Sequence, residues 1–436
     1  DGREPRRRGR WGARPAGRTV SRVSNNDRRP SEWHPSTIPP DEQRRWERAA
    51  AIGFGSVEPD DHWSVDQIED LGRRAWAVED AGVIVGTSAD LVWHLTLPGG
   101  ATMPVGAILA VTTRATHRRQ GVLRSLMSAQ LRAMATEGLA AAVLTASEGT
   151  IYGRFGFGVA TSQHRLEAPV HGHGLDHVRP GRIELDAASV FRDEIVKFRR
   201  RSARHRPGTL ERPEEWWDQL VLGDQVSFEG GGPQFVSLHR DDQGEVDGYA
   251  LWRTEGLWGE RTIVIRELHT IDPAVELALF RHCADIDLAT SVRWDTAPAD
   301  SPIPAATTDP RRCHVTGVRD QLWLCPLDVS ALLAARTYGA PLDLTLRVDD
   351  HASGWSAPTI ALRLTARPGE QAEVEVLDET PPSRSQDPQP DLVCDRTTLG
   401  MAVLGTTPWS TLVAAGRAGV SNPAVARAAD AAFASH

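Results

Sequence analysis

The sequence predicts a mixed α/β (α+β) fold divided into three units, and three observations support this prediction. The chain has 436 residues, which at about 100–200 residues per domain is enough for two to four separate cores. Apolar strand-like runs are interleaved with segments of helical periodicity throughout the chain. This pattern begins near residue 41 and restarts twice. We therefore expect a tail at 1–40 and ordered domains at 41–180, 181–318 and 319–436.

The first 40 residues differ in charge from the rest of the chain. They hold ten arginines and four acidic residues, a net charge of +6, which leaves −15 for the remainder because the whole chain carries −9. The stretch lacks hydrophobic periodicity, so a disordered basic tail is predicted in preference to an RNA- or anion-binding arm. An acidic body is a poor nucleic-acid binder and attracts cationic substrates. No nucleic-acid partner is therefore expected.

Cysteine usage and hydropathy favour a cytoplasmic location. None of the four cysteines (Cys283, Cys313, Cys325, Cys394) has a CxxC-type neighbour, so each is assigned to a core and no metal site is expected. No run of about 18 apolar residues occurs, which argues against a membrane span. The arginine-rich start also lacks the apolar stretch of a secretory signal.

The first unit is predicted to contain a parallel pair of strands joined by a helix. The run 104–114 is apolar at nearly every position, which is typical of a strand buried on both faces. Met127, Leu131 and Met134 recur at helical spacing in the next segment, and Gly138 can end that helix. Strand, helix and strand in this order describe a crossover connection. The expected elements are a helix (41–54), a hairpin (74–100), a strand (104–114), a helix (117–138) and a strand (139–147).

The second and third units are also predicted to mix helices and strands. The second repeats the element order of the first, but its last helix opens with Asp272-Pro273. A carboxylate there would repel a phosphate, so the second unit is predicted to be a degenerate copy. Its expected elements are a helix (190–201), three strands (235–239, 248–254, 262–271) and a helix (273–286). Those of the third are a strand and helix (322–339), three strands (342–348, 360–366, 372–378), a mixed segment (399–420) and a helix (423–433).

One basic loop suggests anion binding. The sequence VTTRATHRRQGVLRSLM (111–127) runs from the buried strand through Arg118 and Arg119 into the helix. A helix N-terminus offers unpaired N–H groups, and Gly121 would let the backbone approach a phosphate. Such a loop alone is also compatible with a solvated helix start. The crossover context favours phosphate binding, while GxGxxG and Walker patterns are absent.

A second informative segment, ASEGTIYGRFGFG (146–158), comes directly after the next strand. Tyr152 is one of three tyrosines, and its phenol could protonate a departing thiolate, although a buried tyrosine with a satisfied hydroxyl is also compatible with the position. Glu148 could act as a base or could bond nearby backbone amides. Glycines 153, 156 and 158 suggest tight turns or a bulge in the next strand.

These segments resemble a known family. The spacing Arg118-x-x-Gly121-x-Leu123 is similar to the (Arg/Gln)-x-x-Gly-x-(Gly/Ala) signature of GCN5-related N-acetyltransferases (GNATs), with leucine in the last place. Together with ASEGTIYGRFGFG and DAAFAS near the C-terminus, it resembles the Eis-like (enhanced intracellular survival) N-acetyltransferases. The resemblance covers about residues 41–436. It implies two tandem acetyltransferase domains, the second degenerate, followed by a sterol-carrier-protein-like α+β domain.

The resemblance also implies an activity and a set of site residues. The expected reaction is direct acetyl transfer from acetyl-CoA to amines of aminoglycosides or other polycationic amines by a homo-oligomer, a hexamer. Tyr152 would be the general acid, and the base would be the carboxylate of the last residue, here His436. The cofactor-binding residues carried over are Val111, Thr112, Thr113, Arg119, Gln120, Gly121, Val122, Leu123, Arg124, Ser147 and Glu148.

The sequence departs from the family pattern at several points. Relatives continue about ten residues past DAAFAS, whereas this sequence stops at His436, so we expect either that the sequence is truncated or that the base differs. Ala110 stands where relatives often have an aromatic residue, and Thr113 replaces an aliphatic one. The acidic and aromatic stretch Asp60–Trp63 is a candidate wall for a cationic acceptor, or an exposed helix start. A different class of function also stays open, namely a non-catalytic scaffold carrying an apolar ligand in its C-terminal domain.

Overall fold

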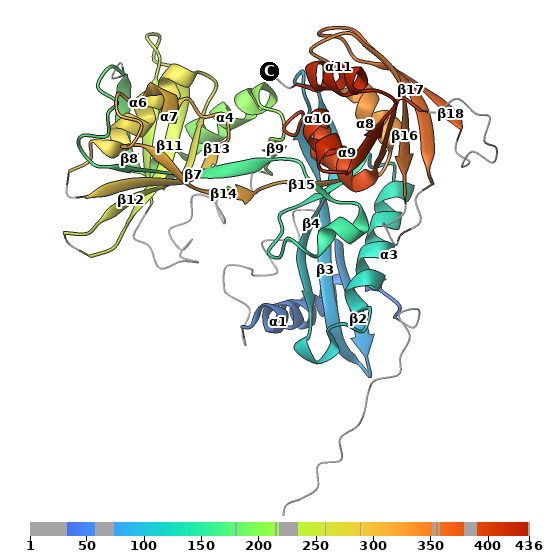
Figure 1. Cartoon of the computed structure of the whole chain (residues 1–436). Coiled ribbons are helices and arrows are strands. Elements are labelled where there is room, and N and C mark those ends of the chain that lie inside the picture. Colours follow the sequence, from blue (N-terminus) through green and yellow to red (C-terminus); the bar gives the residue numbers. More distant parts are fainter. Residues whose placement is uncertain are drawn as a thin grey trace, which may run out of the picture.

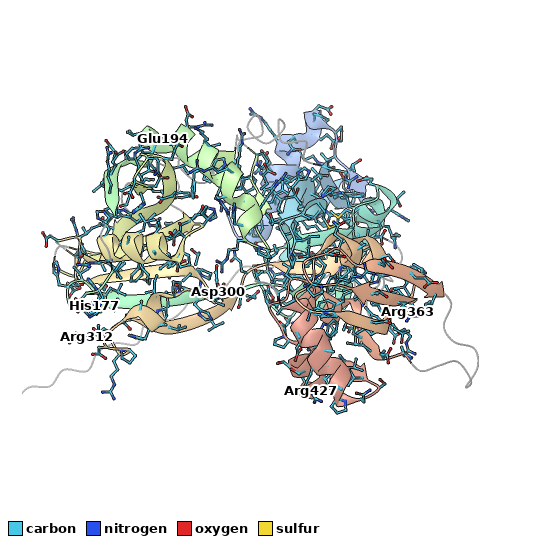
Figure 2. The ribbon with its side chains drawn as sticks, turned by 90° about the horizontal axis from the view of Figure 1, so that it is seen from above. His177, Glu194, Asp300, Arg312, Arg363 and Arg427 are labelled. Atoms are coloured by element: carbon cyan, nitrogen blue, oxygen red, sulfur yellow. The ribbon has the colours of Figure 1, made fainter. Side chains whose placement is uncertain are left out.

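The computed structural model describes residues 33–56, 74–178, 181–213, 216–217, 234–257, 259–287, 289–350, 355, 358–378 and 390–434. The described chain forms three sheets with helices packed on them (Figure 1). The third unit, coloured orange to red, lies against the first, coloured blue to teal, while the second stands to one side. Figure 2 confirms this from above: the second unit carries the labelled Glu194 and Arg312, and the third carries Arg363 and Arg427.

The first unit contains the predicted crossover. Its sheet has the order β1-β2-β3-β4-β5-β15-β6, with β9 paired to β3, and β4 and β5 run parallel. The helix α3 connects them and buries Met127, Leu131 and Met134 as the periodicity predicted. The elements are β1 (Ser36–Thr37), η2 (Pro40–Glu42), α1 (Gln43–Phe54), β2 (Arg74–Asp80), β3 (Val83–Thr96), β4 (Thr102–Thr113), η5 (Ala115–His117), α3 (Val122–Thr136), β5 (Ala141–Leu144), η6 (Tyr152–Phe155) and β6 (Gly158–Val159).

The second unit has its own sheet and core. Its strand order is β14-β7-β13-β12-β11-β10-β8, and β12 and β13 form its parallel pair. The elements are β7 (Ser162–Pro169), β8 (Arg182–Ala187), η7 (Ala188–Phe191), α4 (Arg192–Ser202), η8 (Ala203–His205), β9 (Leu210–Glu211), β10 (Phe235–Arg240), β11 (Val246–Glu255), β12 (Thr262–Thr270), α6 (Pro273–Ala284), β13 (Ser291–Pro298), α7 (Ile303–Ala306) and β14 (His314–Asp320).

The third unit shares a core with the first. Leu95 of β3 and Val105 of β4 are fully buried in the same apolar cluster as Leu332 and Leu333 of α8. Its sheet has the order β18-β17-β16-β19-β20. The elements are β15 (Trp323–Pro326), α8 (Val329–Ala335), β16 (Leu342–Asp349), β17 (Ile360–Ala366), β18 (Glu373–Asp378), β19 (Leu392–Asp395), α9 (Arg396–Ala402), α10 (Trp409–Ala414), β20 (Ala418–Val420) and α11 (Pro423–Phe433).

The sheets exchange strands between the units, so the predicted boundaries at 180 and 318 do not coincide with the sheets. β7 lies in the second sheet, beside β13, although it precedes residue 180. β15 lies beyond residue 318 but returns to the first sheet, between β5 and β6. β7 thus carries chain of the predicted first unit into the second sheet, and β15 carries chain of the predicted third unit into the first sheet.

The predicted tail also extends too far. Trp33 is buried, its indole N–H donates to the Gln120 carbonyl at 2.8 Å, and β1 pairs with β2. Residues 33–40 therefore belong to the first unit, and the remainder of the predicted tail lies outside the described residues. The four cysteines are buried and free. No helix in the described part of the chain is long and apolar enough to cross a bilayer.

Candidate active site

A wedge opens in the first sheet where its two parallel strands diverge. β4 and β5 pair only at Gly106–Ala142 and Ala107–Val143. Beyond Ala107 the edge of β4 that faces β5 has no strand partner in these two fully described strands. Ala110 has a positive φ of 51° and the register of β4 on β3 shifts beside it, so a bulge bends β4 away from β5. Unpaired strand edges can bind an extended chain.

The wedge forms part of a cavity of about 790 Å³. Of the residues predicted to bind the cofactor, all except Gln120 line it. The lining residues are Gly53, Phe54, Val111, Thr112, Thr113, His117, Arg118, Arg119, Gly121, Val122, Leu123, Arg124, Ser147, Glu148, Thr150, Ile151, Tyr152, Arg154 and Phe155. The structure thus brings together the two segments that the sequence analysis singled out, although about 30 residues separate them in the chain.

The basic loop has the backbone shape of an anion cradle. Gly121 is the N-cap of α3 and adopts a left-handed conformation with φ 89°, and Arg119 is left-handed as well, with φ 64°. The first three amides of α3 precede the first intrahelical acceptor, so they are free to bind a ligand. These amides, the helix dipole and the exposed Arg118 and Arg119 make one end of the cavity electropositive.

Two of the residues predicted to bind the cofactor, Gln120 and Thr112, also make structural contacts. The Gln120 carbonyl accepts from Trp33, and its side-chain amide donates to the Thr116 carbonyl at 3.1 Å. The Thr112 hydroxyl lies 2.7 Å from that of Thr87, and a Cβ added at Gly53 of α1 would come within 2.3 Å of it. Gln120 and Thr112 therefore fix the loop and the packing of α1.

Tyr152 also lines the cavity and is the first residue of η6. Its side chain is 5% exposed and packs with Phe157 in a T-shaped contact of 6.1 Å. Within the described residues its hydroxyl makes no hydrogen bond, which leaves it available to a ligand in the cavity. Burial, and secondarily the negative charge of Glu148, raises the pKa of Tyr152 above its usual value of 10.0. The phenol therefore stays protonated at neutral pH. Glu148 and Ser147 are exposed at the rim.

Several cavity residues have no counterpart in the sequence prediction. Phe54, the last residue of α1, is 64% exposed although it lines the cavity. His117 also lines it, with its Nε2 3.2 Å from an oxygen of Asp80. The sequence shows Phe54 only as an apolar residue at the end of a predicted helix. A single sequence does not distinguish such a residue from a core position. Asp60–Trp63 and His436 lie outside the described residues.

The second unit fills the corresponding place with its own side chains. β12 and β13 pair as far as Ile265 and then diverge. Just beyond, Glu267 accepts a hydrogen bond from Tyr249 and one of 2.7 Å from Arg212. At the start of α6, the Asp272 carboxylate accepts from the Ala274 amide at 2.8 Å. A carboxylate thus occupies the helix N-terminus at which a phosphate would bind. In the described residues no cluster of His, Cys, Asp and Glu could hold a metal ion.

Comparison with known proteins finds three family domains in the order of the three units. Residues 35–160 and 208–324 each match the acetyltransferase (GNAT) domain family, and residues 329–436 match the sterol carrier protein domain family. An uncharacterized N-acetyltransferase of Streptomyces griseus is 35% identical over 331 residues, 72% of this chain and 79% of the relative. The N-acetyltransferase Eis of Mycobacterium tuberculosis is 31% identical over 366 residues, 81% of this chain and 83% of the relative.

Solved structures agree on the fold. The crystal structure of Eis1 from Mycobacterium abscessus has a TM-score of 0.76 and 28% identity, and the match covers 92% of this chain and 97% of that one. A GCN5-related N-acetyltransferase from Anabaena variabilis, at 15% identity, has a TM-score of 0.75 over 93% of this chain and 98% of that one. Fold and cavity therefore define an acetyltransferase of the GNAT class. The chain belongs to the Eis-like GCN5-related N-acetyltransferase family, with two GNAT domains followed by a sterol-carrier-protein-like domain.

Proposed function

We propose that this chain transfers the acetyl group of acetyl-CoA to amines of cationic small molecules, aminoglycosides or polyamines, in the cavity of the first unit. The observation that supports this most strongly is the presence of two features in one cavity. A left-handed glycine at the start of α3 lines it, and so does Tyr152, whose hydroxyl makes no hydrogen bond among the described residues. The first feature suits a pyrophosphate and the second suits a leaving thiolate.

In this proposal the donor lies along the wedge. Its pyrophosphate binds the amides of Val122 and Leu123 and the guanidinium of Arg119. Its pantetheine arm pairs with the free edge of β4 through the backbone of Val111 and Thr113, which are two residues apart and therefore present the same side of the strand. The acetyl group then reaches Tyr152. Most of the rate enhancement would come from this positioning.

The transfer is direct. The amine, once deprotonated, attacks the thioester carbonyl, so a C–N bond forms and the C–S bond breaks. Backbone amides near Val111 stabilise the oxyanion, and Tyr152 gives its proton to the departing thiolate and is reprotonated from water. The family resemblance assigns the base to the chain-terminal carboxylate, here at His436, and assigns a hexameric assembly. Both stay predictions, and sedimentation measures the second.

Replacing the phenol tests the proposal. Tyr152→Phe keeps the ring and its contact with Phe157, and it removes only the acid. We expect kcat to fall by about 10²–10⁴-fold, the usual contribution of a general acid, with little change in the KM for acetyl-CoA. A variant that keeps the wild-type kcat would remove Tyr152 from the mechanism.

A further inference from the structure

We propose that Thr397 of the third unit is a positioning residue for acetyl transfer, because it holds in place the turn that carries Tyr152. The inference rests on the proposed role of Tyr152 as the general acid. It assigns to the sterol-carrier-like domain a part in catalysis through its α9 helix, which packs against β15 and β6 of the first sheet.

The turn that carries Tyr152 cannot fix its own position. η6 has four residues, Tyr152–Phe155, and a single 3₁₀ turn has little stability of its own. Two backbone hydrogen bonds that close the turn are long, at 3.2 Å from the Gly156 amide to the Gly153 carbonyl and 3.4 Å from the Phe157 amide to the Tyr152 carbonyl. Gly153 lies within the turn and Gly156 directly after it, so the backbone there is also unusually free.

Side chains of the third unit add hydrogen bonds to this turn. The Thr397 hydroxyl donates to the Gly153 carbonyl at 3.0 Å, one residue from Tyr152, and the Thr397 side chain is buried. The Trp355 indole N–H donates to the Phe155 carbonyl at 3.2 Å. These two bonds hold both ends of the turn, and both donors belong to the third unit.

Thr397 is itself held rigidly. It lies in the first turn of α9, whose N-cap Asp395 accepts from the Thr398 amide at 2.7 Å. The helix lies so close to the first sheet that a Cβ at Gly158 would come within 2.0 Å of the Thr397 carbonyl, and one at Gly400 within 2.2 Å of the Leu324 carbonyl. Such close backbone packing leaves the hydroxyl little freedom to move relative to the turn.

Next to Thr397, a buried arginine supports the same junction. The Arg396 guanidinium donates to the Pro326 carbonyl at 2.9 Å and to the Pro358 carbonyl at 3.1 Å. It also lies over the Trp355 ring, 5.6 Å from the centroid. The two donors that hold η6 are therefore connected to each other through Arg396, and they form one rigid support for the turn.

Loss of the Thr397 hydroxyl should slow the chemical step without weakening the binding of acetyl-CoA. Among the described residues the Thr397 hydroxyl bonds to η6 and to no residue of the loop at Gly121, so its loss should displace the phenol and leave the donor's phosphate site unchanged. A displacement of about 1 Å at a catalytic group can cost up to about 10²-fold in rate. We expect Thr397→Val, which keeps the shape and removes the donor, to lower kcat by about 10-fold or more, and the KM for acetyl-CoA to change less than about twofold.

The chain offers a matched control. The Thr406 hydroxyl also donates from the third unit to a first-unit carbonyl, that of Ala160, at 2.6 Å, but Ala160 lies beyond η6. Thr406→Val removes the same kind of bond and should leave kcat within about twofold of wild type. Thr397→Ser keeps the hydroxyl and should restore kcat. If both valine variants lose kcat equally, the effect is general destabilisation of the interface and the inference is wrong.

A double-mutant cycle separates this inference from the proposed function. The rates are measured as release of CoA thiol from acetyl-CoA with spermine and neomycin as acceptors. In the Tyr152→Phe background, Thr397→Val should cost no further kcat, because no phenol remains to be positioned. If Tyr152→Phe itself retains kcat, the proposed acid fails. If Tyr152→Phe loses kcat but Thr397→Val does not, only the positioning role fails.

A second readout does not depend on turnover. Hydrogen exchange of peptides covering 150–158, measured on the full chain, reports how firmly the turn is held. We expect faster exchange there in Thr397→Val and in Trp355→Phe, and unchanged exchange in Thr406→Val. Unchanged exchange in all three variants would overturn the inference even if Thr397→Val had lost activity.

Discussion

Gly121 allows a sharp test of the phosphate site, because the same helix has a matched glycine at its other end. Gly121 and Gly138 flank α3 with φ values of 89° and 79°. A Cβ at either position therefore meets the same left-handed strain, about 1–2 kcal/mol for a residue other than glycine. Only Gly121 lines the cavity. A Cβ at Gly138 would have no atom within 4 Å.

The two alanine variants should thus differ in binding and not in stability. Each should lower the free energy of unfolding by about 1–2 kcal/mol. Gly121→Ala also places a Cβ beside the amides that we assign to the pyrophosphate. Losing one hydrogen bond to a charged group costs about 1.5–3 kcal/mol, which corresponds to roughly 10- to 150-fold in Kd. We expect that loss of acetyl-CoA affinity in Gly121→Ala and none in Gly138→Ala.

Calorimetric titration with acetyl-CoA, with urea denaturation run in parallel, measures both quantities. Wild-type affinity for acetyl-CoA in both variants would refute the assignment of the α3 N-terminus as the phosphate site. Equal losses of affinity would refute it as well, because the effect would then track helix strain and not the cavity.

Three further predictions concern the first two units. Glu267→Gln should lower the free energy of unfolding by about 3–5 kcal/mol, since it leaves Arg199 and Arg212 buried without their carboxylate. Burial alone would raise the pKa of Glu267, but the charges of Arg212 and Arg199 hold that pKa well below 4.5. The stabilisation should therefore be complete above about pH 4.5 and be lost as the pH falls further. Denaturation at pH 7 and at pH 4 measures this loss. The raised pKa of Tyr152 predicts no alkaline loss of kcat below about pH 10; a limb near pH 8 in a pH–rate profile would contradict its role. Acetyl-CoA should bind at one site per chain, because Asp272 blocks the second unit; two sites in a titration would show that the second unit is not degenerate.

The order of elements could be predicted from the sequence because most of it is determined locally. Periodicity predicted the helix at 117–138, which the structure places at Val122–Thr136. The difference has a physical cause: Arg119 and Gly121 are left-handed, so the helix cannot include them. The final helix, predicted at 423–433, has those bounds in the structure, with Asn422 as its cap and Pro423 at its first position.

Strand partners could not be predicted in this way. The apolar run at β15 predicts a strand, but nothing in it specifies that it inserts between β5 and β6, far back in the chain. The burial of Trp33 could not be predicted for a related reason. Trp33 is a single apolar residue after an arginine-rich stretch, and its contact with Gln120 is visible only in the fold. Likewise, the segment around Tyr152 could be recognised from its residues, whereas its dependence on Thr397, some 240 residues later, is visible only in the fold.

Product analysis tests most directly whether the first unit transfers acetyl groups to amines. The full chain is incubated with acetyl-CoA and a panel of aminoglycosides and polyamines, and thiol release and the mass of each amine are measured together. We expect amines that gain whole acetyl groups in step with thiol release, and loss of both in Tyr152→Phe. Tight binding of acetyl-CoA without any acetylated amine across the panel would contradict this expectation and would favour a non-catalytic binding protein.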